Sequence, residues 1–374
     1  MNKAARCEPH GARVGVTAAS HKVIANLLET VLDVAQNSGN SVECVRKVSD
    51  ASPQPGRITE YKKNEDIDDI VQATSRTVIG GTPFLWARPE LHEKLDVLFV
   101  DEAGQMSLAN VLAASQCARS LVLLGDPQQL EQPQQGSHPT GADLSALEHI
   151  LKEHPTIPPE RGIFLPETWR LPPSICAFTS EVFYEGKLHS KSGLEQRELR
   201  NTELIDGTGL WVLPVAHEGN QNCSPEEVDA IEFLIDRLLG VRGEWIEREG
   251  VVEPITPAHI LIVAPYNSQV ALLADRLGPR GVRVGTVDKF QGQQAPIVIY
   301  SMATSAPEDA PRGMEFLYSL NRLNVATSRA QCACILVANP RLFAPECKTP
   351  RQMKLANALC RYVEMADTLS AVPV

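Results

Sequence analysis

A short apolar run that ends in two adjacent carboxylates is the most constraining feature of this chain. Residues 97–100 are apolar, and Asp101 and Glu102 follow directly. Runs of this length bounded by polar residues are typical of strands buried on both faces. Open α/β sheets bind ligands at the carboxyl ends of their strands. Mg²⁺ on a nucleotide is usually held by one or two carboxylates, and a neighbouring Glu can orient a water toward the γ-phosphate. The pair therefore predicts half of an ATPase site.

The same kind of apolar run recurs with helix-like segments between. The other runs are residues 14–16, 121–124, 260–263, 297–300 and 335–337. Residues 22–34 carry apolar side chains at a period that fits one buried helix face. Ser224 and Pro225 have the character of an N-cap and a first-turn proline, opening a helix that ends near Gly240. Alternating strands and helices predict an α/β class with parallel sheets buried on both faces.

The chain is long enough for two cores, since 374 residues exceed one ordinary domain. Proline and glycine punctuate residues 132–166, around a short helix-like piece at 144–152. We therefore expect a break there, with one lobe on either side. Residues 51–64 and 306–313 are polar or proline-rich and predict surface loops.

Bulk composition narrows the class of protein. With 43% hydrophobic and 22% charged residues, no signal-peptide start and no long apolar window, the chain is expected to be soluble and cytoplasmic, without membrane contact. A net charge of −11 counts against a purely electrostatic nucleic-acid binder without excluding one. Nine cysteines without a C-x-x-C pair predict buried thiols, and we assign no metal to Cys332 and Cys334.

A second polar turn follows the next predicted strand. Gly125, Asp126 and Pro127 precede Gln128 and Gln129. Such a turn is common, and Asp126 can simply accept from nearby backbone amides. Its place one strand after the acidic pair favours an active-site loop, where a glutamine amide can sense the γ-phosphate.

The order of six motifs resembles a known family. DEAGQ, GDPQQL, ETWRLPPSI, APYNSQ, GTVDKFQGQQAPIVI and NRLNVATSRA follow one another. They resemble motifs II to VI of superfamily 1 helicases of AAA type, in the branch with RecB-like nucleases fused to a helicase. GVTAASHK at residues 15–22 resembles motif Ia. The resemblance spans residues 11–345, and six motifs in order are far more specific than any one.

The resemblance implies two RecA-like domains with ATP between them and a single strand across the top. The expected division is an incomplete first domain at residues 1–162, a second domain at 163–346 and a C-terminal helical tail at 347–374. Closure of the cleft would couple hydrolysis to domain motion. The implied cofactors are ATP and Mg²⁺, and the implied partner is single-stranded nucleic acid, DNA in preference to RNA.

The resemblance also implies site residues. Asp101 would hold Mg²⁺, Glu102 would activate water, and Gln129 would read the γ-phosphate. Arg170 and Arg329 would act as arginine fingers, since planar guanidinium groups suit spread phosphoryl charge. The remaining nucleotide-binding positions would be Asp126, Tyr266, Gln291, Gly292 and Gln294.

Contacts to the strand are implied at Ser20, His21, Thr82 and Thr286, because hydroxyls and amides bind phosphates without reading sequence. Each is also explained by ordinary capping or turn chemistry. Trp86 and Trp169 can stack on bases, although core packing is the favoured prediction for both.

Two features depart from the family pattern. Gln294 stands where relatives commonly carry Glu, a change we expect to be mild. The phosphate cradle G-x-x-x-x-G-K-[ST] occurs nowhere in the 374 residues. The resemblance then implies the helicase portion of a longer polypeptide, whose N-terminal part carries a nuclease and the cradle, with little ATPase activity in this chain alone.

Two function classes stay open at this stage. The first is the helicase portion just described. The second is a binding or scaffold protein that keeps the helicase shape without hydrolysing ATP. A small-molecule kinase fits poorly, because the motifs from ETWR to NVATSRA have no role in one.

Overall fold

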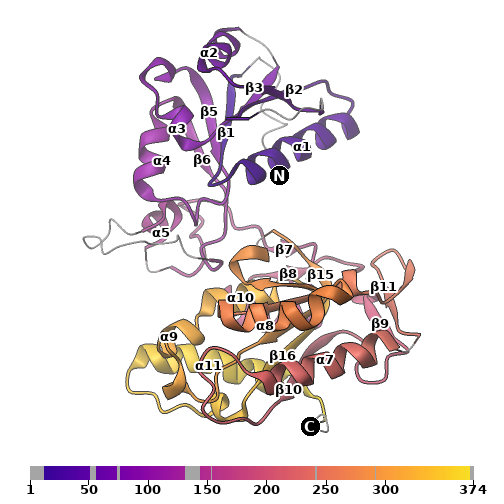
Figure 1. The fold of residues 1–374 in the computed structure, drawn as a ribbon. Helices are drawn as coiled ribbons and strands as arrows, with labels where there is room; N and C mark the ends of the chain where they lie inside the picture. Colours follow the sequence, from indigo (N-terminus) through magenta and orange to yellow (C-terminus); the bar gives the residue numbers. More distant parts are fainter. Residues whose placement is uncertain are drawn as a thin grey trace. The chain divides into compact units, whose positions relative to one another are not determined.

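The chain folds into two α/β units, residues Met1–His154 and Pro155–Val374, with the earlier elements in indigo to magenta and the later ones in pink to yellow (Figure 1). The computed structural model describes residues 12–50, 56–73, 76–130, 144–152, 154–240, 242–290 and 292–370. The boundary between the units lies within residues 132–166, where we expected a break. The finer division at residue 162 and the separate tail at 347–374 stay predictions.

The sheet of the first unit is parallel throughout its described residues. Its strands lie in the order β3-β2-β4-β1-β5-β6. They are β1 (Val14–Thr17), β2 (Glu43–Lys47), β3 (Thr59–Tyr61), β4 (Thr77–Gly80), β5 (Leu95–Val100) and β6 (Ala118–Leu123). Every residue of the central strand β1 is buried, as expected where helices cover both faces.

Helices cover the two faces of this sheet unequally. α1 (His21–Asn37) packs Ile24, Leu28 and Val31 on one face, against Val14 and Val16 of β1. The other face carries α2 (Asn64–Gln72), α3 (Pro83–Trp86), α4 (Leu108–Ser115) and α5 (Ala146–Leu151). A 3₁₀ helix (Pro89–Leu91) precedes β5.

The edge strand β6 contradicts one prediction. Residues 121–124 were expected to be buried on both faces, but Leu121 is 38% exposed and Val122 is only half-buried. The reason is position, since β6 pairs only with β5 within the described residues and Val122 packs only in part against the core that α1 shares. In the part of the first unit that the structure describes, the sheet therefore ends at β6, with backbone groups that no further strand pairs.

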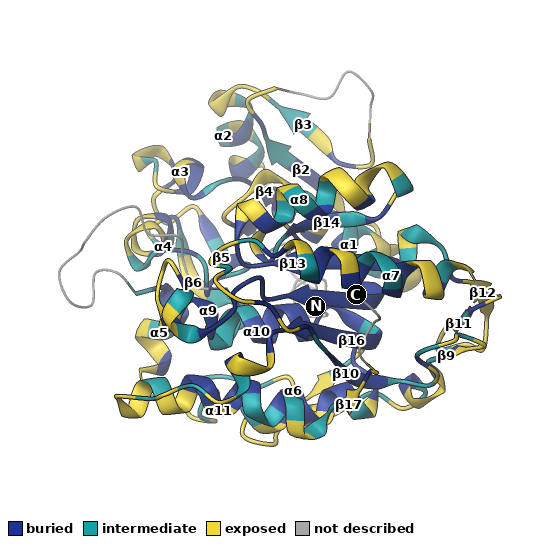
Figure 2. Cartoon of the chain, turned by 60° about the horizontal axis from the view of Figure 1, so that its bottom comes forward, coloured by how far each residue is buried: buried dark blue, intermediate teal, exposed yellow. Residues whose placement is uncertain are grey.

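The second unit contains another parallel sheet, in the order β14-β13-β15-β16-β10-β17. Its strands are β10 (Gly209–Pro214), β13 (Ile260–Ala264), β14 (Arg283–Thr286), β15 (Ala295–Ser301), β16 (Ala330–Ala338) and β17 (Asp367–Thr368). β13 and β15 are buried along their whole length, and β16 is buried at all but one residue. Figure 2 accordingly shows β13 and β16 in dark blue.

This sheet is covered on both faces. α7 (Pro225–Gly240) and α8 (Asn267–Leu277) share one core with β10, β13, β15 and β16. α6 (Pro173–Phe183), α10 (Leu320–Thr327) and α11 (Pro350–Met365) lie on the opposite side in Figure 2. The Tyr362 hydroxyl fastens α11 to the sheet, donating to the carbonyl oxygen of Cys334 at 2.8 Å.

Smaller elements complete the second unit. β7 (Glu167–Thr168) pairs with β8 (His189–Ser190), and β9 (Glu198–Arg200), β11 (Glu244–Ile246) and β12 (Val252–Pro254) form an antiparallel sheet. α9 (Met314–Leu317) precedes α10. The 3₁₀ helices are Leu194–Gln196, Pro257–His259, Gly278–Arg280, Asp288–Phe290, Pro307–Asp309 and Pro340–Phe343.

Most sequence-based elements are confirmed. Each of the six apolar runs lies in or overlaps a strand of a parallel sheet, and Pro225–Gly240 forms the predicted helix. The loop predicted at residues 51–64 is wrong in part, because residues 59–61 form β3, where Glu60 pairs with Arg46 of β2. Residues 51–55 lie outside the described part of the chain.

The expectations for the cysteines and for long apolar segments can be compared with the structure. Five of the eight cysteines within the described residues are buried, and burial raises the pKa of Cys332 and of Cys334 to about 12. Among the helices that the structure describes, none is long and apolar enough to cross a membrane.

Trp86 anchors the core of the first unit, and its loss should be costly. The indole is fully buried and donates to the carbonyl oxygens of Val16 and Gly81, at 3.2 Å each. We expect Trp86→Ala to lower the free energy of unfolding by about 3–5 kcal/mol in urea denaturation. Phe84→Ala on the same helix is the control, since Phe84 is 79% exposed and should change it by less than about 0.5 kcal/mol. Equal losses in the two variants would contradict this packing.

Candidate functional site

The acidic pair stands at the carboxyl end of β5. The backbone N–H of Asp101 donates to the carbonyl oxygen of Thr17 at 2.8 Å, and Asp101 Oδ1 accepts from the Glu102 N–H at 3.0 Å. Burial raises the pKa of Asp101, against the lowering effect of that N–H. Glu102 has a φ of +52°, a conformation that non-glycine residues seldom adopt and that is often found at functional sites.

The turn after β5 packs directly on the turn after β6. The Ala103 N–H donates to the Leu124 carbonyl oxygen at 2.8 Å. A Cβ on Gly104 would lie 3.0 Å from the carbonyl oxygen of Asp126, and one on Gly125 would lie 2.9 Å from the nitrogen of Ala103. Both contacts are with backbone atoms, so only glycine fits at this approach. The two motifs that the sequence placed in separate loops therefore form one surface.

Asp126 organises the second of these turns. Its Oδ1 accepts from the Gln128 N–H at 2.9 Å, and its Oδ2 accepts from the Gln129 side-chain amide at 3.1 Å. The ordinary explanation for Asp126, acceptance from nearby backbone amides, is thus met. The same carboxylate also orients Gln129, the residue predicted to read the γ-phosphate.

The groups around Asp101 suit a hydrated Mg²⁺. Within the described residues, Asp101 Oδ1 accepts from the Glu102 N–H, and the buried Thr17 Oγ1 on the neighbouring strand β1 has no partner. Thr17 is the β1 residue whose carbonyl oxygen binds the Asp101 N–H. Mg²⁺ prefers oxygen ligands and usually keeps several waters, which need such polar partners. The donor set fits the predicted ion.

In the second unit, Arg170 joins three motifs. Its Nε donates to Gln294 Oε1 at 2.8 Å and its Nη1 to the carbonyl oxygen of Ser328 at 3.1 Å. Ser328 immediately precedes Arg329, which is 2% exposed. The two predicted arginine fingers are therefore brought together, at the amino ends of β15 and β16. Gln294, noted as a departure from relatives, accepts one of the Arg170 bonds.

Arg197 supports Arg170 and was missed by the sequence analysis. It is 5% exposed, and its Nη1 donates to the carbonyl oxygen of Arg170 at 2.6 Å. Burial lowers the pKa of Arg197, which still stays far above neutrality for an arginine. No motif marks it, because its role depends on a fold contact between β7 and the turn before β9.

The other nucleotide-binding predictions are not all brought to these arginines. Gly292, with a φ of +75°, lies two residues before Gln294. Gln291 lies outside the described residues. Tyr266 follows β13 at the opposite, carboxyl edge of the sheet, separated from Gln294 by the length of β15, about 20 Å. Its predicted role beside the nucleotide thus lacks the geometric support that Gln294 has.

The predicted strand contacts all lie at carboxyl edges, and several serve as caps. Ser20 caps α1, accepting from the Val23 N–H at 3.3 Å, and His21 is the first residue of that helix. Thr82 follows β4 and precedes α3 without a side-chain capping bond. Thr286 ends β14 and accepts from the Lys289 N–H at 3.4 Å. These positions leave the contacts to a nucleic-acid strand as predictions, because a residue at a helix terminus can also bind a phosphate.

The two tryptophans differ sharply. Trp86 is fully buried, which confirms the core-packing prediction. For Trp169 that prediction is wrong, because the side chain is 61% exposed. Lys191 Nζ lies 4.7 Å from the Trp169 ring centroid and the Arg248 guanidinium carbon 5.1 Å from it. The short β7–β8 pairing ends just before Trp169 and leaves no core to cover it.

A buried polar network behind the carboxyl edge was also missed. Glu227 is fully buried, and its Oε2 accepts from Ser301 Oγ at 2.6 Å and from the Ala303 N–H at 2.9 Å. Its Oε1 lies 3.2 Å from His217 Nε2, and His217 Nδ1 lies 2.7 Å from Ser305 Oγ. The network holds the loop after β15, where Ala303 has a φ of +66°. In sequence, Glu227 resembles any acid in a first helical turn.

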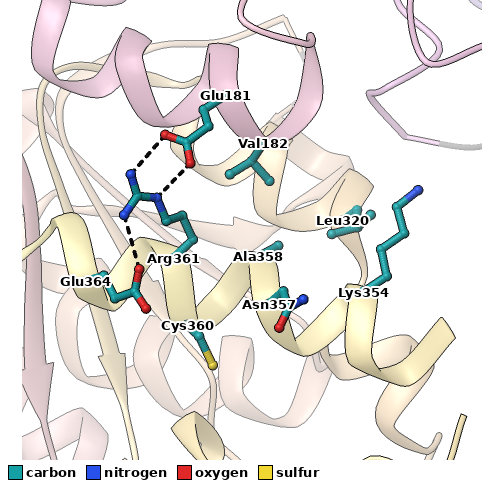
Figure 3. A pocket seen from close by; sticks show the side chains of 9 residues that line it. All are labelled: Glu181, Val182, Leu320, Lys354, Asn357, Ala358, Cys360, Arg361 and Glu364. Atoms are coloured by element: carbon teal, nitrogen blue, oxygen red, sulfur yellow. Dashed lines mark hydrogen bonds and ion pairs between the residues drawn. The ribbon is translucent and has the colours of Figure 1, made fainter. Parts of the chain in front are cut away.

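A cavity of about 390 Å³ between α6 and α11 is a separate feature (Figure 3). Arg361 lies in it, bonded to both carboxylate oxygens of Glu181 at 2.8 and 3.0 Å and to Glu364 at 3.1 Å. The hydrogen bond to Glu181 raises the pKa of Arg361. Since two carboxylates already neutralise this arginine, the cavity is not the predicted phosphate site.

Two family models match parts of the chain that together contain the six motifs. A model described as AAA domain matches residues 142–341, more than half of the chain. The chain belongs to this AAA domain family. A second model, the viral superfamily 1 RNA helicase core domain, matches residues 60–157. These matches confirm the resemblance to superfamily 1 helicases. The structure has two α/β units, each with a parallel sheet, as the resemblance implied.

Curated relatives are similar to this chain over part of their length. The DNA polymerase alpha-associated DNA helicase A of Schizosaccharomyces pombe is 25% identical over 342 residues, 82% of this chain and 50% of that protein. The DNA replication ATP-dependent helicase/nuclease DNA2 of Gallus gallus is 27% identical, covering 66% of this chain and 23% of that protein. The ATP-dependent helicase NAM7 of Saccharomyces cerevisiae is 27% identical, covering 68% and 26%. The chain spans about a quarter to a half of these relatives.

Asp101 and Asp96 lie on or beside the same strand and should affect stability in opposite directions. Burial raises the pKa of Asp101 above the ordinary 3.8, so its charged form destabilises the folded chain as the pH rises through that range. We expect Asp101→Asn to unfold at higher urea than the parent at pH 7, and the difference to vanish where both folded and unfolded Asp101 are protonated.

Asp96→Asn is the matched control. The Arg13 backbone N–H, at 2.8 Å from Asp96 Oδ2, lowers the pKa of Asp96. That stabilisation is present above pH 3.8 and is lost as the pH falls through the lower folded value. This variant should therefore lose stability at pH 7. Shifts of the same sign in both variants would show that burial does not set the charge state of Asp101.

Proposed function

We propose that this chain is the motor part of a nucleic-acid helicase, which uses ATP hydrolysis to move along a single strand, DNA in preference to RNA. Family membership supports the helicase class. The preference for DNA is supported by the relatives whose names specify DNA helicases, although the viral family model is that of an RNA helicase.

The observation that carries the proposal is the bonding of Arg170 to Gln294 and to the residue before Arg329. Three motifs far apart in sequence place two guanidinium groups at one edge of one sheet. A small-molecule kinase has no use for this second unit. A helicase does, because arginine fingers supplied from a second domain link hydrolysis to domain closure.

Each residue at the nucleotide site has a defined task in this proposal. Asp101 would hold Mg²⁺, which would supply positive charge against the charge that develops on the phosphates. Glu102 accepts a proton from the attacking water. Gln129, oriented by Asp126, senses the γ-phosphate. Arg170 and Arg329 stabilise the transferring phosphoryl group with forked N–H donors.

Further residues complete the proposed nucleotide and strand sites. Gln294 orients Arg170, and Gly292 allows the backbone turn before it. Gln291 and Tyr266 stay proposals that rest on the motif resemblance alone. Along the strand path, Ser20, His21, Thr82 and Thr286 would contact phosphates through hydroxyl, amide or imidazole groups.

We further propose that turnover requires a segment of a longer polypeptide. The G-x-x-x-x-G-K-[ST] cradle does not occur in this sequence. The exposed edge of β6, with Leu121 on it, can accept a further parallel strand of the kind that leads into such a cradle. A relative named as a helicase/nuclease suggests that a nuclease accompanies it. The alternative is a strand-binding scaffold that never hydrolyses ATP.

The chain alone should bind a single strand but hydrolyse ATP very slowly. Removing even one preorganised donor to a transition state can cost about 10²-fold or more in rate, and the missing loop supplies several. The measurement is strand-stimulated phosphate release alongside fluorescence anisotropy with labelled oligothymidylate and oligouridylate. Glu102→Gln should leave strand binding unchanged.

Two results would overturn parts of this proposal. Rapid turnover that Glu102→Gln abolishes would show that the chain is catalytically complete. Failure of the parent chain to bind either oligonucleotide, while it melts cooperatively, would reject the helicase function itself. Tighter binding to oligouridylate would reject only the preference for DNA.

A further inference from the structure

Two arginines share one aromatic ring at the carboxyl edge of the second sheet. The guanidinium carbon of Arg312 lies 3.8 Å from the centroid of the Phe316 ring, and that of Arg322 lies 4.1 Å from it. The three residues come from the segment before α9, from α9 and from the first turn of α10 (Figure 1). Stacking on a ring holds the guanidinium plane and leaves its N–H edge available for hydrogen bonds.

Among the described residues, no acid pairs with either guanidinium. Within the part of the chain that the structure describes, Arg312 and Arg322 form no ion pair, although the nearest acid on α9, Glu315, pairs with Arg351 at 3.4 Å. Arg341, on the following 3₁₀ helix, is likewise paired, with Glu308 at 2.8 Å. Two guanidinium groups held on one ring concentrate positive charge at this place, and that charge attracts anions. The chain as a whole has a net charge of −11, so this local concentration of positive charge is opposite in sign to the charge of the chain.

The pair lies beside the ends of two central strands. The rings of Tyr266 and Phe316 are 5.4 Å apart, and Tyr266 is the second residue after β13. The guanidinium groups of Arg312 and Arg322 also lower the pKa of Tyr266 against the larger effect of burial. Carboxyl edges of open parallel sheets are where ligands bind. Thr286, a predicted strand contact, ends the neighbouring strand β14 in register with the last residue of β13.

We infer that Arg312 and Arg322, stacked on Phe316, form a clamp for phosphodiester groups of a single nucleic-acid strand at this edge. The inference rests on the proposed function and deepens it, since it adds an electrostatic contact to the hydroxyl contacts of the motifs. The guanidinium N–H groups donate to non-bridging phosphate oxygens, a charge-assisted and base-independent contact. A triphosphate carries the same chemistry, so the test must separate the two sources.

The test measures anisotropy of fluorescein-labelled oligothymidylate with the full chain at several salt concentrations. The double variant Arg312→Ala/Arg322→Ala should bind about tenfold more weakly. Its plot of log affinity against log salt should flatten by about 1.4, because each lost phosphate contact on a single strand contributes about 0.7. Phe316→Leu keeps both charges but removes the shared ring, and should weaken binding by about threefold.

The matched control is Arg341→Ala/Arg351→Ala, which removes the same charge from two exposed arginines that are already paired. It should leave both affinity and salt slope nearly unchanged. Arg312→Lys/Arg322→Lys keeps the charge but lacks the planar guanidinium. Its affinity for oligothymidylate should lie between those of the parent and the double alanine variant.

The outcomes separate the inference from the function on which it rests. If the parent binds oligothymidylate and the double alanine variant binds equally well with the same slope, the clamp is wrong and the helicase function stands. If both double alanine variants weaken binding equally, only general charge matters and the clamp is again wrong. If the double variant Arg312→Ala/Arg322→Ala loses binding of a fluorescent ATP analogue but still binds oligothymidylate, the two arginines bind a triphosphate and the clamp is wrong. A parent that binds no strand would overturn both proposals.

Discussion

The common direction of the strands in each large sheet is the constraint on which the rest of this structure depends. Parallel strands end at the same edge, so the turns that follow them meet there. In the first unit this brings the turn containing Asp101 and Glu102 against the turn containing Asp126, with glycines where their backbones approach most closely. These backbone contacts bring the chemistry of two separate sequence motifs onto one surface.

The second unit uses both edges of its sheet. At the amino ends of β15 and β16, Arg170, Gln294 and Arg329 are assembled by hydrogen bonds and burial. At the carboxyl ends, the Tyr266 ring lies 5.4 Å from the Phe316 ring on which the two arginines stack, and Glu227 fixes the loop that follows β15. The length of β15 separates the two edges. Under the proposed function, β15 would connect the edge that carries the arginine fingers with the edge that binds the strand.

The sequence predicted what local periodicity and motif order encode. The apolar runs, the helix at Pro225–Gly240 and the convergence of Arg170 toward the Arg329 motif could all be expected. The exposure of Leu121 could not, because it depends on which strands flank β6 in the sheet. Arg197 and Glu227 were missed for a related reason, since a buried polar residue looks ordinary until its partners are known. Trp169 was misjudged because aromatic residues are usually core residues, and only the short β7–β8 pairing leaves this one exposed.

Hydrogen exchange of the chain with and without bound oligothymidylate tests the central claim most directly, that a single nucleic-acid strand binds at the carboxyl edges of these sheets. The account predicts slower exchange in the loops after β1 and β4 of the first unit and after β13, β14 and β15 of the second. The cavity around Glu181 and Arg361 should exchange at an unchanged rate. Protection confined to that cavity, with none in the carboxyl-edge loops of either unit, would contradict the account.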